Sequence, residues 1–265
     1  MKLCFWVPLL LSSCSSNEVA VAVKTMPLAD KIKVFHPPVP WSQPIVRQGP
    51  GDRVVLLHGL WQSNHALEGL AVRLNDAGYE VINLPYRSFR DPLEIIVRNA
   101  AKEVGPSDKP THFVSHSMGG IVIRQLADEF PDLVTGRIVM IAPPNQGSEI
   151  IDWLSGSPLA RWTLGPGGMA LSTENVRSHM AGLPPRNEVG VIMGSCKTHP
   201  FFQHLLPGEN DGTVRVEGGR LPGLSDFTTV NVSHVFMPVQ TKVAEFVENF
   251  LKSGKFSEED VQSSK

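Results

Sequence analysis

The sequence predicts an α/β protein with a mostly parallel sheet and helices on both of its faces. Short, continuous apolar runs such as Arg53–Leu57 (RVVLL) are typical of strands that are buried on both sides. These runs alternate with longer segments whose apolar residues recur at helical spacing, which favours parallel strands joined by crossover helices. The 265 residues, 42% hydrophobic and 19% charged, suit one domain with a full-sized core.

Six apolar runs are expected to form strands, at residues 53–59, 80–84, 111–115, 137–141, 189–193 and 227–232. Helices are expected at residues 63–77, about 91–104, about 118–130 and 239–251. Residues 148–185 break this alternation, because their tryptophans and leucines lie among glycines and prolines without a clean period. An insertion of this kind forms either a lid over an apolar cleft or an irregular cover for the core.

The stretch Thr111–Gly120 (THFVSHSMGG) places Ser117 at the corner between an expected strand and an expected helix. Such a corner exposes the serine Oγ at the top of a sheet and puts the N–H of the next residue, Met118, beside it at a helix N-terminus. The usual pattern is G-x-S-x-G, and here Ser115 replaces the first glycine. Ser117 is therefore the candidate nucleophile, and a plain helix N-cap is the alternative.

A serine nucleophile needs an imidazole base and a carboxylate that orients the imidazole. Of the nine histidines, His234 is the best candidate, because it directly follows the last expected strand and precedes the final helix. A packed histidine at a helix entry is the alternative. Asp211 follows the penultimate strand in the sequence Asn-Asp-Gly, which is also a plain turn signal, and Glu209 is its nearest rival as the acid.

Acyl transfer also needs N–H donors for the oxyanion that develops in the transition state. We expect these donors to be the backbone N–H groups of Met118 and of Leu60, which follows the first expected strand. His58, Gly59 and Trp61 in the same loop, together with Trp153 of the insertion, are the expected residues of the substrate pocket.

Taken together, these residues resemble the α/β-hydrolase superfamily, and bacterial lipases and esterases in particular. The resemblance extends from about Arg53 to Leu251 and includes the H-G-L loop, the S-H-S-M-G-G corner, the stretch Ala142–Ser148 (APPNQGS), and the late Asp-Gly and His. It implies an α/β-hydrolase fold and ester hydrolysis through an acyl-enzyme, with the chain order Ser117, Asp211, His234 that this fold requires.

Two alternatives to an esterase or lipase stay open at this point. An acyltransferase, thioesterase or amidase would use the same three residues, since the difference lies in pocket shape and water access. A non-catalytic envelope-binding lipoprotein on a hydrolase fold is the alternative from another class. The expected substrate is a small-molecule or lipid ester, and the expected state is a monomer.

The first residues have the layout of a secretory signal, with a positive charge, a short apolar run and small residues (MKLCFWVPLLLSSC). The apolar run is much shorter than the roughly 20 residues of a membrane-spanning helix. Leu11–Cys14 (LSSC) resembles the bacterial lipoprotein box, which implies lipidation of Cys14 and a membrane anchor in the cell envelope, with secretion as the alternative. Residues 1–14 would then be the signal peptide, 15–50 a tether and irregular segment, 51–253 the hydrolase domain, and 254–265 a disordered tail.

Composition and motifs argue against other classes of function. The formal net charge of −2 leaves no basic excess for nucleic acid. The sequence has no P-loop, no dinucleotide fingerprint and no H-E-x-x-H motif, and its three cysteines (Cys4, Cys14 and Cys196) lack metal-ligand spacing. We therefore expect no cofactor and no metal, with a structural calcium left open, and we expect Cys196 to be a small core residue without a disulfide.

Overall fold

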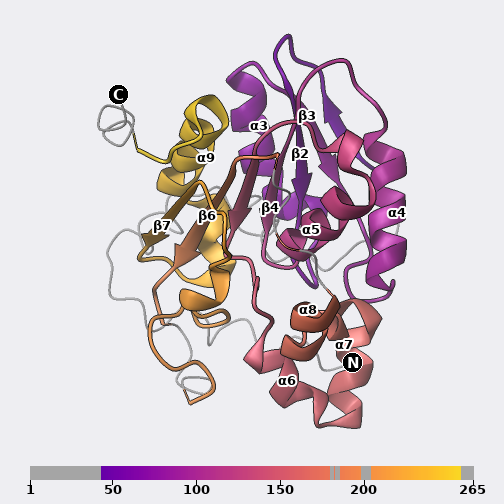
Figure 1. The fold of residues 1–265 in the computed structure, drawn as a ribbon, viewed down its shortest axis with the longest axis vertical. Coiled ribbons are helices and arrows are strands. Elements are labelled where there is room, and N and C mark those ends of the chain that lie inside the picture. The colour runs from indigo at the N-terminus through magenta and orange to yellow at the C-terminus, as the bar shows by residue number, and fades with distance from the viewer. Residues whose placement is uncertain (1–42, 180–181, 183–185, 198–203, 258–265) are drawn as a thin grey trace.

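The computed structural model describes residues 43–179, 182, 186–197 and 204–257. They form a seven-stranded sheet in the order β1-β3-β2-β4-β5-β6-β7, as Figure 1 shows. The strands are β1 (Ile45–Arg47), β2 (Arg53–Leu57), β3 (Glu80–Leu84), β4 (Thr111–His116), β5 (Ile138–Ile141), β6 (Val189–Gly194) and β7 (Asp226–Val230). Strands β2 to β7 pair in parallel, and only β1 is antiparallel to its neighbour among them. The predicted mostly parallel sheet is therefore confirmed.

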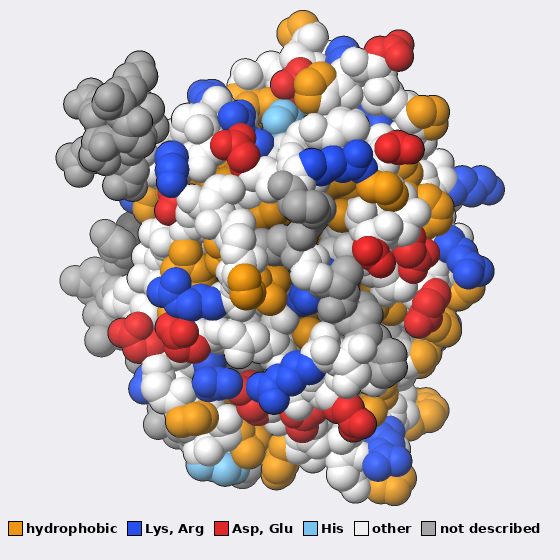
Figure 2. All heavy atoms as spheres, in the orientation of Figure 1, with side chains coloured by type: hydrophobic (Ala, Val, Ile, Leu, Met, Phe, Trp, Pro, Cys, Tyr) orange, Lys and Arg blue, Asp and Glu red, His pale blue; other side chains and the backbone are white. Residues whose placement is uncertain are grey.

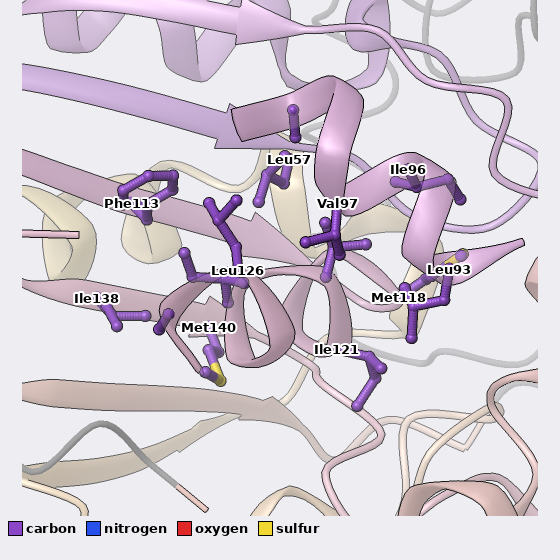
Figure 3. Close-up of a cluster of buried hydrophobic side chains, with 14 of the residues drawn as sticks. Leu57, Leu93, Ile96, Val97, Phe113, Met118, Ile121, Leu126, Ile138 and Met140 are labelled. Atoms are coloured by element: carbon purple, nitrogen blue, oxygen red, sulfur yellow. The ribbon is translucent and has the colours of Figure 1, made fainter. Parts of the chain in front are cut away.

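Helices cover both faces of the sheet. On one face α4 (Leu93–Val104) and α5 (Gly119–Glu129) pack over a core that includes Leu57, Phe113 and Met140, drawn in Figure 3. On the other face α3 (Glu68–Asp76) and α9 (Thr241–Ser253) pack over the alternate residues of the same strands. Every residue of β2 and β4 is buried, as expected for central strands of a parallel sheet.

The insertion after β5 is helical. It contains α6 (Glu149–Ser155), α7 (Pro158–Met169) and α8 (Thr173–His179), which gather at the lower end of Figure 1. Ser148 caps α6 by accepting a hydrogen bond from the Ile151 N–H at 3.4 Å. Within α7, Gly165 adopts φ +60° directly before Pro166 and kinks the helix. This kink, together with the shortness of α6 and α8, explains why the sequence shows no helical period here.

Short 3₁₀ turns complete the fold: η2 (Asn64–Leu67), η3 (Pro131–Leu133), η5 (Glu217–Gly219) and η6 (His234–Val239). The turn η2 precedes α3, so the helix predicted over residues 63–77 begins as a 3₁₀ turn. The turn η6 lies between β7 and α9 and carries His234.

The folded domain extends beyond its predicted bounds at both ends. Strand β1 lies within the residues expected to form a tether, and its three residues are too few to show a pattern. At the other end, Gly254 ends α9 at φ +75°, and the buried Phe256 then packs against Phe250, with ring centroids 4.9 Å apart. The prediction that a disordered tail begins at residue 254 is therefore wrong for residues 254–257.

Cys196 is buried, as expected, but it is disulfide-bonded, so the prediction that it forms no disulfide is wrong. The residue bonded to Cys196 lies outside the described residues. The predicted signal peptide, lipidated Cys14 and most of the predicted tether also lie outside them. No helix in the described part of the chain has the length and hydropathy needed to span a membrane.

Candidate active site

Ser117 sits in a tight turn between β4 and α5. Its φ is +53°, a left-handed conformation that non-glycine residues rarely adopt. The turn is fixed on both sides, because the Ser117 N–H donates to the Ile141 carbonyl at 2.8 Å and the Ser117 carbonyl accepts from the Gly120 N–H at 2.9 Å. A Cβ at Gly119 would lie 2.4 Å from the Leu57 carbonyl oxygen, so only glycine allows α5 to start this close to β2.

The three residues predicted as nucleophile, base and acid lie together. His234 Nε2 is 2.9 Å from Ser117 Oγ, and His234 Nδ1 is 2.7 Å from Asp211 Oδ2. The other carboxylate oxygen of Asp211 accepts the N–H groups of Thr213 at 2.9 Å and Val214 at 2.7 Å. Asp211 is completely buried, and Ser117 and His234 are less than a tenth exposed. An acceptor-only carboxylate at Nδ1 requires the proton there, which leaves Nε2 free to accept from the serine hydroxyl.

The topology of the sheet brings these residues to one edge. Ser117 follows β4, Asp211 follows β6 and His234 follows β7, and the carboxyl ends of parallel strands share one edge. A backbone hydrogen bond from the His234 N–H to the Asp211 carbonyl, 3.0 Å long, ties the two loops together. Glycine at position 194 leaves room for the Asp211 loop, since a Cβ there would lie 2.7 Å from Asp211 Cβ.

In the loop after β2, three of the four consecutive N–H groups already have an acceptor. The Gly59 N–H donates to Gln62 Oε1 at 2.9 Å, the Trp61 N–H to Ser88 Oγ at 3.0 Å, and the Gln62 N–H to the Gly59 carbonyl at 3.3 Å. Among the described residues the Leu60 N–H has no such acceptor. The Met118 N–H, at the start of α5, likewise has none within the part of the chain that the structure describes. The two predicted oxyanion donors are thus available to a ligand at Ser117.

His58 holds the peptide bond that carries the Leu60 N–H. Its Nε2 accepts from the Tyr86 N–H at 3.3 Å, so the proton lies on Nδ1, which donates to the Gly59 carbonyl at 2.9 Å. Because a trans peptide points its C=O and N–H in opposite directions, this bond turns the Leu60 N–H away from His58. The imidazole stacks on the Tyr86 ring at 4.0 Å, and burial lowers its pKa to about 4.

His116, the residue before Ser117, connects the loop after β2 (residues 58–62, called the oxyanion loop below) with His234. Its Nε2 lies 3.1 Å from the His234 carbonyl, and its Nδ1 lies 3.1 Å from the same Gln62 Oε1 that accepts from Gly59. Burial first, and then neighbouring His234, hold the pKa of His116 well below its usual value. Neutral His116 carries one ring proton, so it donates to only one of these two oxygens. Sequence reasoning missed Gln62 and this role of His116, because both depend on contacts between distant loops.

A cavity of about 220 Å³ opens in front of Ser117. Gly59 and Trp61 line it as predicted, but His58 does not, because it is completely buried beneath the loop. Trp153 does not line it either: Ile150, Ile151 and Leu154 turn one side of α6 to the cavity, and Trp153 lies about 100° around the helix from them and is half exposed. The full lining is Gly59, Leu60, Trp61, Gln62, His116, Ser117, Pro144, Ser148, Ile150, Ile151, Leu154, Leu171, Thr213, Val214, His234 and Val235.

Glu209, the rival acid, is exposed, and only its backbone takes part in the Asp211 turn, where its carbonyl accepts from the Val216 N–H. No group of three His, Cys, Asp or Glu side chains in the described part of the chain is arranged to hold a metal ion.

Comparison with known proteins agrees with this architecture. The model of the alpha/beta hydrolase family matches residues 54–239, which is most of the chain. The chain belongs to the alpha/beta hydrolase family. No curated protein sequence matches this hydrolase.

Among solved structures, the hydrolase is similar to the mature form of the Bacillus licheniformis lipase BlEst2, with a TM-score of 0.61 and 18% identity over 80% of this chain and 98% of the lipase. It is also similar to phospholipase PlaB from Legionella pneumophila, with a TM-score of 0.55 and 14% identity over 77% of this chain and 64% of the phospholipase. A third similar structure comes from work on LipS and LipT, two metagenome-derived lipolytic enzymes, with a TM-score of 0.53 and 15% identity over 81% of this chain and 98% of the matched chain. At these identities the likeness shows the fold.

Proposed function

We propose that this hydrolase cleaves carboxylic esters through an acyl-enzyme formed on Ser117. One observation carries the proposal: Ser117 Oγ lies 2.9 Å from His234 Nε2, and the opposite ring nitrogen lies 2.7 Å from the buried carboxylate of Asp211. That geometry supports proton transfer from the hydroxyl to the imidazole as the oxygen attacks a carbonyl carbon. Among the described residues, no Asp, Glu, Lys or Arg side chain lines the cavity, which suits an uncharged acyl group.

In the first half of the reaction, Ser117 Oγ forms a bond to the carbonyl carbon while His234 Nε2 takes its proton. The carbonyl oxygen becomes an oxyanion, which the Leu60 and Met118 N–H groups bind. When the tetrahedral intermediate collapses, the bond to the alcohol oxygen breaks, and His234 returns the proton to the leaving alcohol. Water then repeats the sequence on the acyl-enzyme, which releases the acid and restores Ser117.

Asp211 and the oxyanion loop lower the barrier without taking part in bond exchange. Asp211 keeps the proton of His234 on Nδ1 and compensates the positive charge that develops on the ring. The Leu60 and Met118 N–H groups stabilise the negative charge of the oxyanion in a largely buried site. Loss of one such donor costs about 10²- to 10³-fold in kcat. The bond from His58 to the Gly59 carbonyl holds one of these donors in place.

The test is hydrolysis of p-nitrophenyl esters by the wild type, Ser117→Ala and Ser115→Ala. We expect Ser117→Ala to lose at least about a thousandfold in kcat/KM, because the nucleophile is removed. Ser115→Ala is the matched control: this buried strand serine lies two residues earlier, and its Oγ has no hydrogen-bond partner among the described residues. It should stay within about threefold of wild type, as expected for loss of an unpartnered hydroxyl. A fluorophosphonate should label Ser117 in the wild type.

If Ser117→Ala kept its activity, the assignment of the nucleophile would be wrong. Thioesters, amides and acyl acceptors other than water belong in the same substrate panel, because Ser117, His234 and Asp211 support their cleavage or transfer as well. A wild type that the fluorophosphonate does not label and that cleaves none of these substrates would favour a binding protein on a hydrolase fold.

A further inference from the structure

The roof of the cavity comes from the insertion. Ile150, Ile151 and Leu154 of α6 and Leu171, which follows α7, lie across the cavity from the loops that carry Ser117 and His234. Ile151 and Leu171 are almost completely buried although they belong to a surface insertion. Side chains of the insertion therefore share with the loops around Ser117 in setting the space available to an acyl group.

The cavity is small. An apolar cavity of about 150 Å³ holds one benzene molecule, whereas sites for drug-sized ligands measure about 300–1,000 Å³. By the same proportion, the cavity of about 220 Å³ holds roughly nine non-hydrogen atoms. An acyl group of about eight carbons with its carbonyl oxygen reaches this limit.

Hydrogen bonds hold the insertion together, and an ion pair joins it to the rest of the hydrolase domain. Both carboxylate oxygens of Asp152 on α6 accept from Thr173, one from its N–H at 3.0 Å and one from its Oγ1 at 2.7 Å. The Ser148 N–H donates to the Leu171 carbonyl at 2.9 Å, which closes the start of α6 onto the end of α7. On the other side, Arg215 Nε binds Glu149 Oε1 at 2.6 Å and joins α6 to the loop that follows Asp211.

Direct backbone packing fastens α7 as well. A Cβ at Gly165 would lie 1.8 Å from the Phe89 carbonyl oxygen, and a Cβ at Gly167 would lie 2.1 Å from the Ser88 carbonyl oxygen. The helix therefore rests on the loop before α4 with no side chain between the two backbones. Trp61 Nε1 adds a hydrogen bond to the Thr163 carbonyl at 3.1 Å. To move away from the rest of the domain, the roof would have to break these backbone contacts, the Trp61 hydrogen bond and the ion pair between Arg215 and Glu149.

We propose that this fastened roof restricts the hydrolase to esters of short acyl groups, up to about eight carbons, with Leu154 as a residue that sets the limit. The inference rests on the proposed ester hydrolysis and adds the substrate class to it. A longer acyl chain would have to displace the roof or leave its end in water outside the cavity, and the contacts that fasten α6 and α7 oppose the displacement. The enzyme is then an esterase that acts on dissolved substrate without a lipid interface.

The experiment measures kcat/KM for p-nitrophenyl esters from acetate to palmitate with four proteins. The wild type should be most active on acyl groups of about four to eight carbons and at least tenfold less active on laurate. One methylene that does not fit an apolar pocket costs about 10- to 200-fold in kcat/KM. Leu154→Ala should shift the optimum toward longer chains, and Leu154→Phe should shift it toward shorter ones. Leu159→Ala, on the exposed surface of α7 and outside the cavity, is the matched control and should leave the profile unchanged.

Three outcomes would overturn the inference. The first is palmitate cleaved as efficiently as butyrate, the second is a sharp rise in rate as the substrate passes its solubility limit, and the third is an equal shift of the profile by Leu154→Ala and Leu159→Ala. Ser117→Ala, assayed beside them, separates the two proposals. A long-chain profile that depends on Ser117 would contradict only the restriction to short acyl groups. A wild type that is inactive on every ester would contradict both that restriction and the proposed ester hydrolysis.

Discussion

Asp211 is completely buried, and both of its carboxylate oxygens meet hydrogen-bond donors. Two backbone N–H groups hold Oδ1, and this leaves Oδ2 directed at the imidazole of His234. A buried carboxylate is stable in the fold only when it is satisfied in this way. The turn Asn-Asp-Gly therefore does more than reverse the chain, because it also orients the Asp211 carboxylate toward His234.

Asp211→Asn should abolish most of the activity and leave the fold intact. The amide oxygen can still accept from the two N–H groups, so the NH₂ group faces His234 Nδ1 and forces the ring proton onto Nε2, which can no longer accept from Ser117. We expect a loss of about 10³- to 10⁴-fold in kcat, measured with p-nitrophenyl butyrate. Glu209→Gln, at the neighbouring exposed acid, is the control. A larger loss in Glu209→Gln than in Asp211→Asn would reverse the assignment of the acid.

His58 should make the protein sensitive to acid. Burial lowers its pKa from 6.5 to about 4, so between these values the unfolded chain binds more protons than the folded protein. Stability is therefore complete above about pH 6.5 and falls as the pH drops toward 4, by on the order of 3 kcal/mol from this residue. The measurement is urea unfolding at pH 7.5 and pH 5. His58→Gln, which has no titrating ring, should lose less stability between the two pH values, and an unchanged difference would contradict this role.

The main candidate residues could be predicted from the sequence because their positions follow from topology. Ser117 and His234 each directly follow an apolar run, and the carboxyl ends of parallel strands share one edge. Contacts between distant loops leave no such signal. The contacts of Gln62 with Gly59 and His116, and the absence of Trp153 from the cavity, depend on how side chains lie once the loops have met.

The corner between β4 and α5 depends on the absence of a side chain at one position. Gly119 lets the first turn of α5 touch the Leu57 carbonyl of β2, and this approach sets the place of the Met118 N–H beside Ser117. Strand, turn and helix therefore act as one unit, and a shift of the helix would move both the nucleophile and an oxyanion donor.

Gly119→Ala should destabilise the protein by about 2 kcal/mol or more and reduce the kcat of the folded protein. The added Cβ would lie 2.4 Å from a backbone oxygen, so the helix must move. Gly69→Ala is the control: a Cβ there meets nothing within 4 Å in α3, and alanine in a helix is about 0.5–1 kcal/mol more favourable than glycine. Urea unfolding and ester hydrolysis measure both effects. Equal stabilities of the two variants would show that the close approach does not matter.

The six long strands could be predicted from their runs of apolar and β-branched residues, which in β2 and β4 are buried along the whole strand, whereas β7 is only partly buried. Elements without such a run could not be predicted. Strand β1 has three residues at the edge of the sheet, and its middle residue, Val46, is half exposed. In the insertion, close backbone contacts at Gly165 and Gly167 replace the apolar stripe that marks an ordinary surface helix.

The formal net charge of the whole chain is close to zero, and charge is spread rather than concentrated on the face seen in Figure 2. Basic and acidic side chains alternate over the face in Figure 2, in keeping with a formal net charge of −2. Such a surface gives no long-range attraction to an anionic membrane or to nucleic acid. The charges on this face would therefore not attach the domain to a membrane. The predicted lipid on Cys14 is the candidate for that role.

We expect Cys14→Ser to move the full-length protein, expressed in a bacterial host, from the membrane fraction to the soluble fraction. Strand β1 begins with Ile45 opposite Asn83, near the carboxyl end of β3, so the described chain enters the sheet at the edge where Ser117 lies. The chain between Cys14 and Gln43 spans at most about 100 Å, which would keep an anchored active site close to the bilayer. Cys4, Cys14 and Cys196 are the only cysteines of the sequence, so a lipid on the Cys14 sulfur excludes a disulfide between Cys14 and Cys196. Mass spectrometry of the Cys14 peptide distinguishes the two, and a disulfide at Cys14 would contradict the anchor. Ser13→Ala is the control. If Cys14→Ser and wild type fractionated alike, Cys14 would not be the anchor.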